Sequence, residues 1–330
     1  MQHTANNQPQ TGNEQIEFSE VEVISSSKAF IEANTCRGTL HELNRQHIIP
    51  VFIKDNEPVI SHGEFIGAAM NAVSQAYHGE TILRPEIRLS HPIKGRVPEA
   101  RNKPAIELLD GEKTIYYERM AFVIEIPTVH TDIAGNRLNL TVGGVKAYNL
   151  DNLYAKSGAD QHFKVFIGFQ NKVCTNLCVS TDGFIADLKV KNIDMLSHAI
   201  LRMVEEFQPV QFSTQLESLE RYELTEQQFA NLIGRCRMHK HLPENLAKDI
   251  PQLMFGDGQI NSVCKDYYLD QDFCCNKSGT INLWNLYNLF TGANKSTYID
   301  NFLDRGVNAF ELTKELQYAL EHKASSWFLN

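Results

Sequence analysis

The residues with the most obvious chemical potential stand in one short stretch, Phe163–Gly183 (FKVFIGFQNKVCTNLCVSTDG). A cysteine can act as a nucleophile when a nearby base or positive charge lowers the pKa of its thiol. On a strand, Lys172 and Cys174 would share one face, so together they define a candidate catalytic site with an as yet unidentified histidine. The polar and thiol residues of this stretch are Asn171, Lys172, Cys174, Asn176 and Cys178.

Strand geometry argues against zinc binding by Cys174 and Cys178 together. On one regular strand, these two thiols would lie on the same face about 13 Å apart, at roughly 3.3 Å per residue. Two thiolates that bind one zinc ion each lie at about 2.3 Å from it. We therefore expect both cysteines to be buried structural residues.

The sequence CRMHKH places Cys236, His239 and His241 at the spacing C-x2-H-x-H. Thiolate and imidazole groups are zinc ligands, but the paired C-x2-C spacing of reliable zinc motifs is absent. The favoured interpretation puts Cys236 in the core and both histidines in solvent among basic neighbours. The sequence thus predicts no metal and no cofactor, and metal binding by these three residues stays open as the alternative.

Residues 84–103 form a basic segment on an acidic chain. Six basic side chains stand there against two acidic ones, whereas the formal net charge of the whole chain is −9. Prolines throughout the segment exclude a long helix and predict an extended loop. Such a loop can follow a phosphate backbone, and arginine binds phosphate in bidentate geometry. The basic residues are Arg84, Arg88, Lys94, Arg96, Arg101 and Lys103.

Three further residues complete the predicted nucleic-acid site. Tyr116 and Tyr117 follow the basic segment, and aromatic rings on a sheet can stack on unpaired bases. Lys172 would add positive charge. In the alternative interpretation, the segment is a surface loop whose charges pair with the acidic region at 205–226.

The elements that must position these residues follow an α+β pattern. Residues 114–180 predict a mainly antiparallel sheet of two hairpins, with turns at DIAGN (132–136) and at Gln170–Asn171. The first strand of this sheet is predicted over 114–126 (TIYYERMAFVIEI). Ser61 with Glu64 forms a capping box before a helix over 61–78, and Asn192 caps a helix over 192–207. These two helices are expected to back the sheet, and a helical C-terminal part follows.

Three regions are predicted along the chain. Residues 1–16 are a polar tail that we expect to be disordered, 17–212 form an α+β domain, and 213–330 form a mainly helical region packed on it. The polar N-terminus is unlike a signal peptide, and no run approaches the roughly 18 apolar residues of a spanning helix. We therefore expect a cytoplasmic protein that does not contact membranes and keeps its cysteines reduced.

Four blocks of the sequence resemble, in order, one protein family. They are HPIKGRVPEARNKP, EKTIYYERMAFVIEIP, LTVGGVKAYNLDNLY and FKVFIGFQNKVCTNLCVSTDG. The family consists of uncharacterised proteins of gut anaerobes grouped as domain of unknown function 3871, and the resemblance spans about residues 28–322. KVCTNLCVSTDG and LWNLYNLFTGANKS also resemble two blocks of the phage/plasmid-like protein family of unknown function. Neither family brings an assigned activity, but the resemblance implies an association with mobile elements.

These observations favour a non-enzymatic nucleic-acid-binding accessory protein of mobile elements, whose partner is single-stranded nucleic acid. Single-strand annealing is a candidate activity, because two hairpins followed by a long helix loosely resemble the core of single-strand annealing proteins. One alternative is an enzyme with a site centred on Cys174 and Lys172. Another is a protein–protein interaction module that uses the acidic region and the C-terminal helices.

Overall fold

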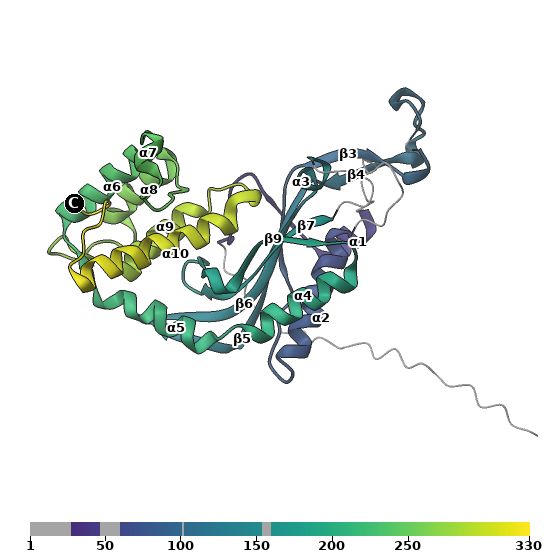
Figure 1. The fold of residues 1–330 in the computed structure, drawn as a ribbon. Helices are drawn as coiled ribbons and strands as arrows, with labels where there is room; N and C mark the ends of the chain where they lie inside the picture. Colours follow the sequence, from purple (N-terminus) through teal and green to yellow (C-terminus); the bar gives the residue numbers. More distant parts are fainter. Residues whose placement is uncertain (1–27, 47–59, 101, 154–159) are drawn as a thin grey trace, which may run out of the picture.

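The computed structural model describes residues 28–46, 60–100, 102–153 and 160–330, so the predicted tail at 1–16 lies outside the described residues. Within them, the centre of the fold is a seven-stranded antiparallel sheet of order β1-β2-β5-β6-β7-β8, with β9 also paired to β7 (Figure 1). The strands are β1 (Cys36–Gly38), β2 (Glu86–Leu89), β5 (Arg119–Ile133), β6 (Asn136–Ala147), β7 (Gln161–Asn171), β8 (Leu177–Cys178) and β9 (Phe184–Val190).

The β5–β6 hairpin forms the middle of this sheet, as predicted. Its two-residue loop consists of Ala134 and Gly135, both with positive φ, which matches the twist of the flanking strands. Side chains alternate along β5, so Phe122 and Ile124 enter one apolar cluster while Val123 enters a second cluster on the opposite face. Both faces of the sheet are therefore covered.

The predicted helices cover the first face. They are α2 (His62–Ala76) and α4 (Ile193–Glu206), which pack side by side beneath the sheet (Figure 1). The capping box at Ser61 and the Asn192 cap are both formed, so both starts are confirmed. The ring of Phe65 on α2 packs edge-on against Phe122, with ring centroids 5.0 Å apart.

Helix α10 (Ile299–His322) crosses the second face of the sheet. Phe302 and Leu303 of this helix pack with Val145 of β6 and Phe166 of β7. The Lys164 ammonium of β7 donates to the Asp300 carbonyl at 2.7 Å, which ties sheet and helix together. The remaining elements are α1 (Leu40–Gln46), α3 (Tyr148–Leu153), α5 (Pro209–Ser218), α6 (Glu226–His239), α7 (Glu244–Ala247), α8 (Asp257–Leu269), α9 (Leu283–Asn294), β10 (Glu223–Leu224) and β11 (Ile281–Asn282).

Two further strands form a separate ribbon that projects as an arm (Figure 1). β3 (Pro92–Arg96) pairs with β4 (Lys113–Tyr117), and short 3₁₀ turns at Pro98–Ala100, Ala105–Glu107 and Asp110–Glu112 build its tip. The sequence prediction of one strand over 114–126 is therefore wrong, because the chain passes at Glu118 from β4 to β5, which belongs to another sheet. We call residues 92–117 the arm.

The second predicted hairpin is much shorter than expected. Only two residue pairs join β7 to β8, and the rest of that edge of β7 pairs with β9. The α+β class, the mainly antiparallel sheet backed by helices and the helical C-terminal part are nevertheless confirmed. No helix in the described part of the chain has the length and apolar character needed to cross a membrane.

Candidate functional site

Strand register gives the arm one basic face. Lys94 lies opposite Ile115 and Arg96 lies opposite Lys113, so these four side chains share a face. Lys94, Ile115 and Lys113 are exposed, and Arg96 is half-buried. Like charges directly opposite each other on paired strands are unfavourable, and an anion would relieve that repulsion. We call these four residues the basic face.

Carboxylates at the tip offset part of this charge. Lys113 lies 2.7 Å from Asp110, and Lys103 pairs with Glu112. The hydrogen bonds from these lysines hold the pKa of Asp110 and of Glu112 below their usual values. Because Asp110 is fully solvated, its ion pair with Lys113 contributes little to stability. Lys113 can therefore release this carboxylate and bind a phosphate instead.

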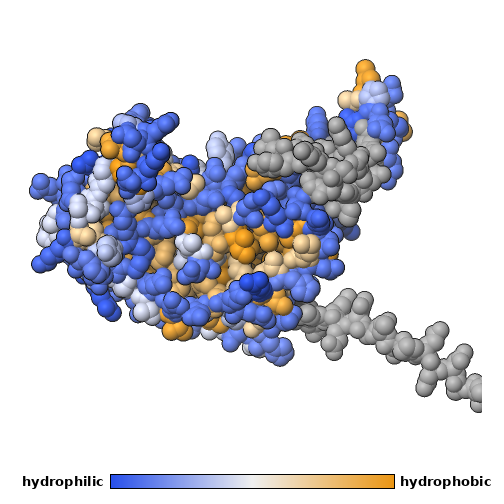
Figure 2. Space-filling model, in the orientation of Figure 1, coloured by the Kyte–Doolittle hydropathy of each residue, from blue (hydrophilic) through white to orange (hydrophobic). Residues whose placement is uncertain are grey.

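The tip of the arm is apolar as well as charged. Ile106 is 94% exposed and Leu109 is 66% exposed. Figure 2 shows apolar atoms at the far end of the arm, away from the body of the molecule. These side chains have no role in the core, so they are available for contact with a ligand or partner.

Three predicted nucleic-acid-binding residues hold the protein itself together. Arg88 donates to the side chain and the carbonyl of Thr35, at 2.9 and 3.0 Å. Tyr116 is only 9% exposed, and its ring packs edge-on against a neighbouring tyrosine. The Tyr117 hydroxyl donates to Glu42 at 2.9 Å, and burial followed by this bond raises the pKa of Tyr117 to about 12.

The other predicted basic residues are spread over the molecule. Lys172 lies 2.8 Å from Glu125, which is roughly 20 Å along β5 from the base of the arm at Arg119. Arg84 is exposed just before β2, and Arg101 lies outside the described residues. The structure thus brings together the predicted residues Lys94, Arg96 and Lys103, and it does not bring Lys172 to them.

The stretch Asn171–Asn176 forms a tight turn between β7 and β8. The Asn171 side chain accepts from the amide of Val173 at 2.9 Å, and the Asn171 carbonyl accepts from the amide of Thr175 at 2.8 Å. Lys172 and Cys174 both lie in this turn, so the expectation that they share a strand face is wrong. The local support for a joint Lys172–Cys174 site is therefore lost.

This turn is packed against helix α9 and the residues that follow it. The Asn176 amide donates to the Asn288 carbonyl at 3.0 Å, and the Lys295 ammonium donates to Thr175 Oγ1 at 2.9 Å and to the carbonyl of Cys174. The predicted polar residues Asn171 and Asn176 are both buried. They form a structural network inside the protein, which a substrate does not reach in this conformation.

Burial also sets the chemistry of the thiols in this region. Burial raises the pKa of the Cys174 thiol to about 11 and raises that of Cys178 even further. A nucleophilic cysteine requires a shift in the opposite direction. The geometry therefore does not favour an enzyme centred on Cys174.

Cys236, His239 and His241 do not converge on one point. Cys236 is buried on α6, His239 Nε2 lies 2.9 Å from the Pro251 carbonyl oxygen, and His241 is exposed. In the described ranges, no group of three or more His, Cys, Asp or Glu side chains is arranged to hold a metal ion.

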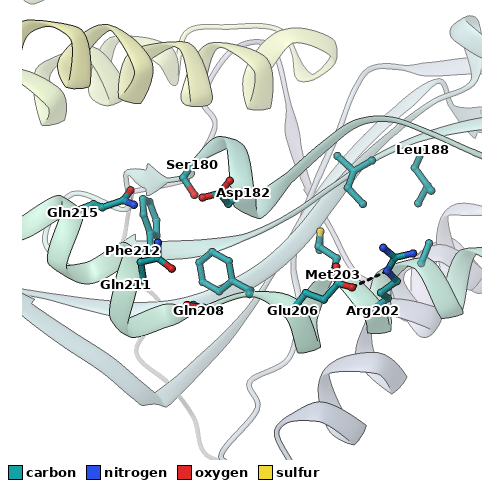
Figure 3. Close-up of a pocket in the computed structure, with 13 residues that line it drawn as sticks. Ser180, Asp182, Leu188, Arg202, Met203, Glu206, Gln208, Gln211, Phe212 and Gln215 are labelled. Atoms are coloured by element: carbon teal, nitrogen blue, oxygen red, sulfur yellow. Dashed lines mark hydrogen bonds and ion pairs between the residues drawn. The ribbon is translucent and has the colours of Figure 1, made fainter. Parts of the chain in front are cut away.

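A cavity of about 570 Å³ lies between β9, α4 and α5. Figure 3 shows Leu188, Met203 and Phe212 among the side chains that line it, together with Gln208 and Gln211. Its charged side chains include an Arg202–Glu206 pair at 2.8 Å together with Asp182. With apolar walls and no excess of positive charge, this cavity suits an apolar group better than a phosphate.

A family model described as "Domain of unknown function, B. Theta Gene description" (domain of unknown function 3871) matches residues 11–329. The chain belongs to this family. The resemblance predicted from the four sequence blocks is thereby confirmed for nearly the whole length. No curated protein and no solved structure matches the chain. The resemblance to the phage/plasmid-like family stays a prediction.

Sequence reasoning missed two residues of the basic face of this family member, the cation Lys113 and the apolar Ile115. Lys113 stands ten residues beyond the predicted basic segment, and only the pairing of β3 with β4 brings it opposite Arg96. The signal that could have found it is the possible hairpin between PIKGR and KTIYY, two short strand-like runs separated by a proline-rich and charged stretch.

Proposed function

We propose that this protein binds single-stranded nucleic acid, without catalysis, through the basic face of its arm. The observation that carries this proposal is the register of β3 and β4, which puts Lys94, Arg96 and Lys113 together on a projecting ribbon. Acidic residues outnumber basic ones over the whole chain, whose formal net charge is −9. A local concentration of positive charge on an acidic protein directs a polyanion to that surface.

The arm also offers apolar contacts beside these cations. Ile115 lies on the same face between the lysines, and Ile106 and Leu109 are exposed at the tip. A single strand exposes its bases, so phosphates can bind the cations while bases contact these aliphatic side chains. A duplex hides its base faces and would use only the cations. This difference is the reason for preferring the single strand.

Fluorescence anisotropy with a labelled oligothymidylate, titrated with salt, tests the proposal. We expect binding at low salt that weakens as salt rises, by a log–log slope of about 0.7 for each phosphate contacted. The variant Lys94→Ala/Lys113→Ala should lower that slope by about 1.4. Arg96 and its bond to the Lys103 carbonyl remain in this variant, which keeps the tip in place.

The matched control is Lys189→Ala/Lys265→Ala, which removes two exposed lysines from β9 and α8. It should leave the salt slope and the affinity unchanged. Absence of binding at low salt, salt-independent binding, or an equal loss in the control would overturn the proposal. Tighter binding of the duplex of the same sequence would contradict the choice of the single strand.

A further inference from the structure

A second cavity, of about 810 Å³, opens where α6 ends. It lies in the part of the molecule formed by α6, α7 and α8, at the opposite end from the arm (Figure 1). We call it the α6 cavity. Its lining includes Arg235, Arg237, Lys240 and His241 from the end of α6 and the turn after it, Asp257 from the start of α8, and Trp327.

Positive charge predominates in this lining. Three permanent cations and one histidine face a single carboxylate among the lining side chains. The pKa of Asp257 is lowered, chiefly by a hydrogen bond from Lys240 and also by Arg237 and His241. Lys240 pairs with Asp257, and Arg237 and His241 line the same cavity, so these groups converge on a common space. An anion entering this space would gain from the same convergence.

An aromatic ring stands beside these charges. The Arg235 guanidinium lies over the Trp327 ring, 5.0 Å from its centroid, and donates to the Asn330 carbonyl oxygen at 2.6 Å. Arg235 thus fixes the position of the indole, and Arg237 and His241 remain exposed toward solvent. Exposed apolar side chains of Met238 and Leu246 also line the cavity.

We infer that the α6 cavity binds a phosphorylated nucleoside. Arg237, Lys240 and His241 would bind the phosphate, since arginine and lysine are the usual phosphate ligands of proteins. Trp327 with Met238 would contact the base, as aromatic and apolar side chains do in nucleotide and single-strand sites. The phosphorylated nucleoside can be a free nucleotide or part of a strand, because both present the same chemistry. This inference does not depend on the arm.

Energy transfer from Trp327 to N-methylanthraniloyl-ADP measures such binding in the full chain. The chain has two tryptophans, and the other, Trp284, is fully buried. We expect saturable transfer that is much reduced in Trp327→Phe and competed by unlabelled ADP at least tenfold better than by inorganic phosphate. Arg237→Ala/His241→Ala should weaken binding at least tenfold. Both side chains are exposed, so far-UV circular dichroism should show an intact fold.

The matched control is Arg202→Ala/His198→Ala, an arginine and a histidine four residues apart on an exposed face of α4. It should bind the probe like the unmodified chain. Displacement of the probe by oligothymidylate, together with weaker oligothymidylate binding by Arg237→Ala/His241→Ala, would show that the phosphorylated nucleoside belongs to a strand. Displacement by nucleotides alone would identify a free nucleotide.

Three results would overturn the inference. They are no saturable transfer, equal competition by phosphate and ADP, and equal competition by polyglutamate, which would indicate an acidic peptide instead.

The arm variant Lys94→Ala/Lys113→Ala separates the two proposals. If it binds the probe normally while the chain binds no oligonucleotide, the proposed function fails and the α6 cavity stands. If oligonucleotide binding depends on the arm and the probe does not bind, the inference about the α6 cavity fails and the proposed function stands.

Discussion

Thr175 has a backbone conformation that few non-glycine residues adopt, with φ of 61°. Such a conformation costs on the order of 1–3 kcal/mol and persists only where surrounding contacts impose it. Here Lys295 donates to Thr175 Oγ1, and the Thr175 hydroxyl lies 3.1 Å from the Ala29 carbonyl oxygen. Lys295 is only 7% exposed, and this burial lowers the pKa of its ammonium group. Contacts from two distant segments therefore fix the turn that contains Cys174.

Cys174 should be unreactive in the native protein. With a pKa of about 11, roughly one thiol in a thousand is ionised at pH 8, and alkylation requires the thiolate. Mass spectrometry after a brief iodoacetamide treatment at pH 8 should show Cys36, which is exposed, modified well ahead of Cys174. In urea, where the protein is unfolded, Cys36 and Cys174 should be modified at similar rates. Rapid native modification of Cys174 would reopen the possibility of an enzyme.

At the scale of elements, β6 and α2 approach closely because β6 contains glycine where they meet. A Cβ at Gly144 would lie 2.5 Å from Phe65 Cζ and 2.6 Å from the Lys164 carbonyl oxygen. Neither neighbour can move easily, since Phe65 is clamped between two aromatic rings and the carbonyl belongs to β7. The separation between helix and sheet therefore depends on this single residue.

Gly144→Ala should destabilise the protein by about 1–3 kcal/mol through overpacking. The matched control is Gly67→Ala on α2, where a new Cβ meets nothing within 4 Å. That substitution should stabilise the protein by about 0.5–1 kcal/mol, because alanine favours helix more than glycine does. Urea unfolding of both variants measures these effects. If Gly144→Ala left the free energy of unfolding unchanged, the sheet and α2 would be able to move apart with little loss of stability.

Local signals were enough to predict some elements but not others. The capping residues Ser61 and Asn192, with apolar residues at helical spacing, located α2 and α4. The arm was missed because its strands are short and pair across an intervening tip, and strand-like runs such as PIKGR and KTIYY do not by themselves specify which run is the partner. The same limit explains why the predicted site residues do not all lie together. Residues 84–103 are neighbours in sequence but enter two different sheets.

At the scale of the whole molecule, the apolar core does not stop at the predicted boundary near residue 212. One buried cluster contains residues of α2, the sheet, α5, α9 and α10. Phe212 stacks on Phe169 of β7 at 5.9 Å and packs edge-on against Phe310 of α10 at 5.4 Å. The division into 17–212 and 213–330 stays a prediction, but the helical region shares its core with the sheet.

This shared core leads us to expect one cooperative unfolding transition for the whole chain. Trp284 and Trp327 both lie in the helical region, so tryptophan fluorescence reports on that region alone. Exposure of the buried Cys178 thiol, which lies on β8, reports on the sheet. In a urea titration the two signals should share one midpoint, because loss of α10 would uncover the apolar second face of the sheet. Separate midpoints would show two independently stable domains, and a fragment ending at residue 212 should then fold by itself.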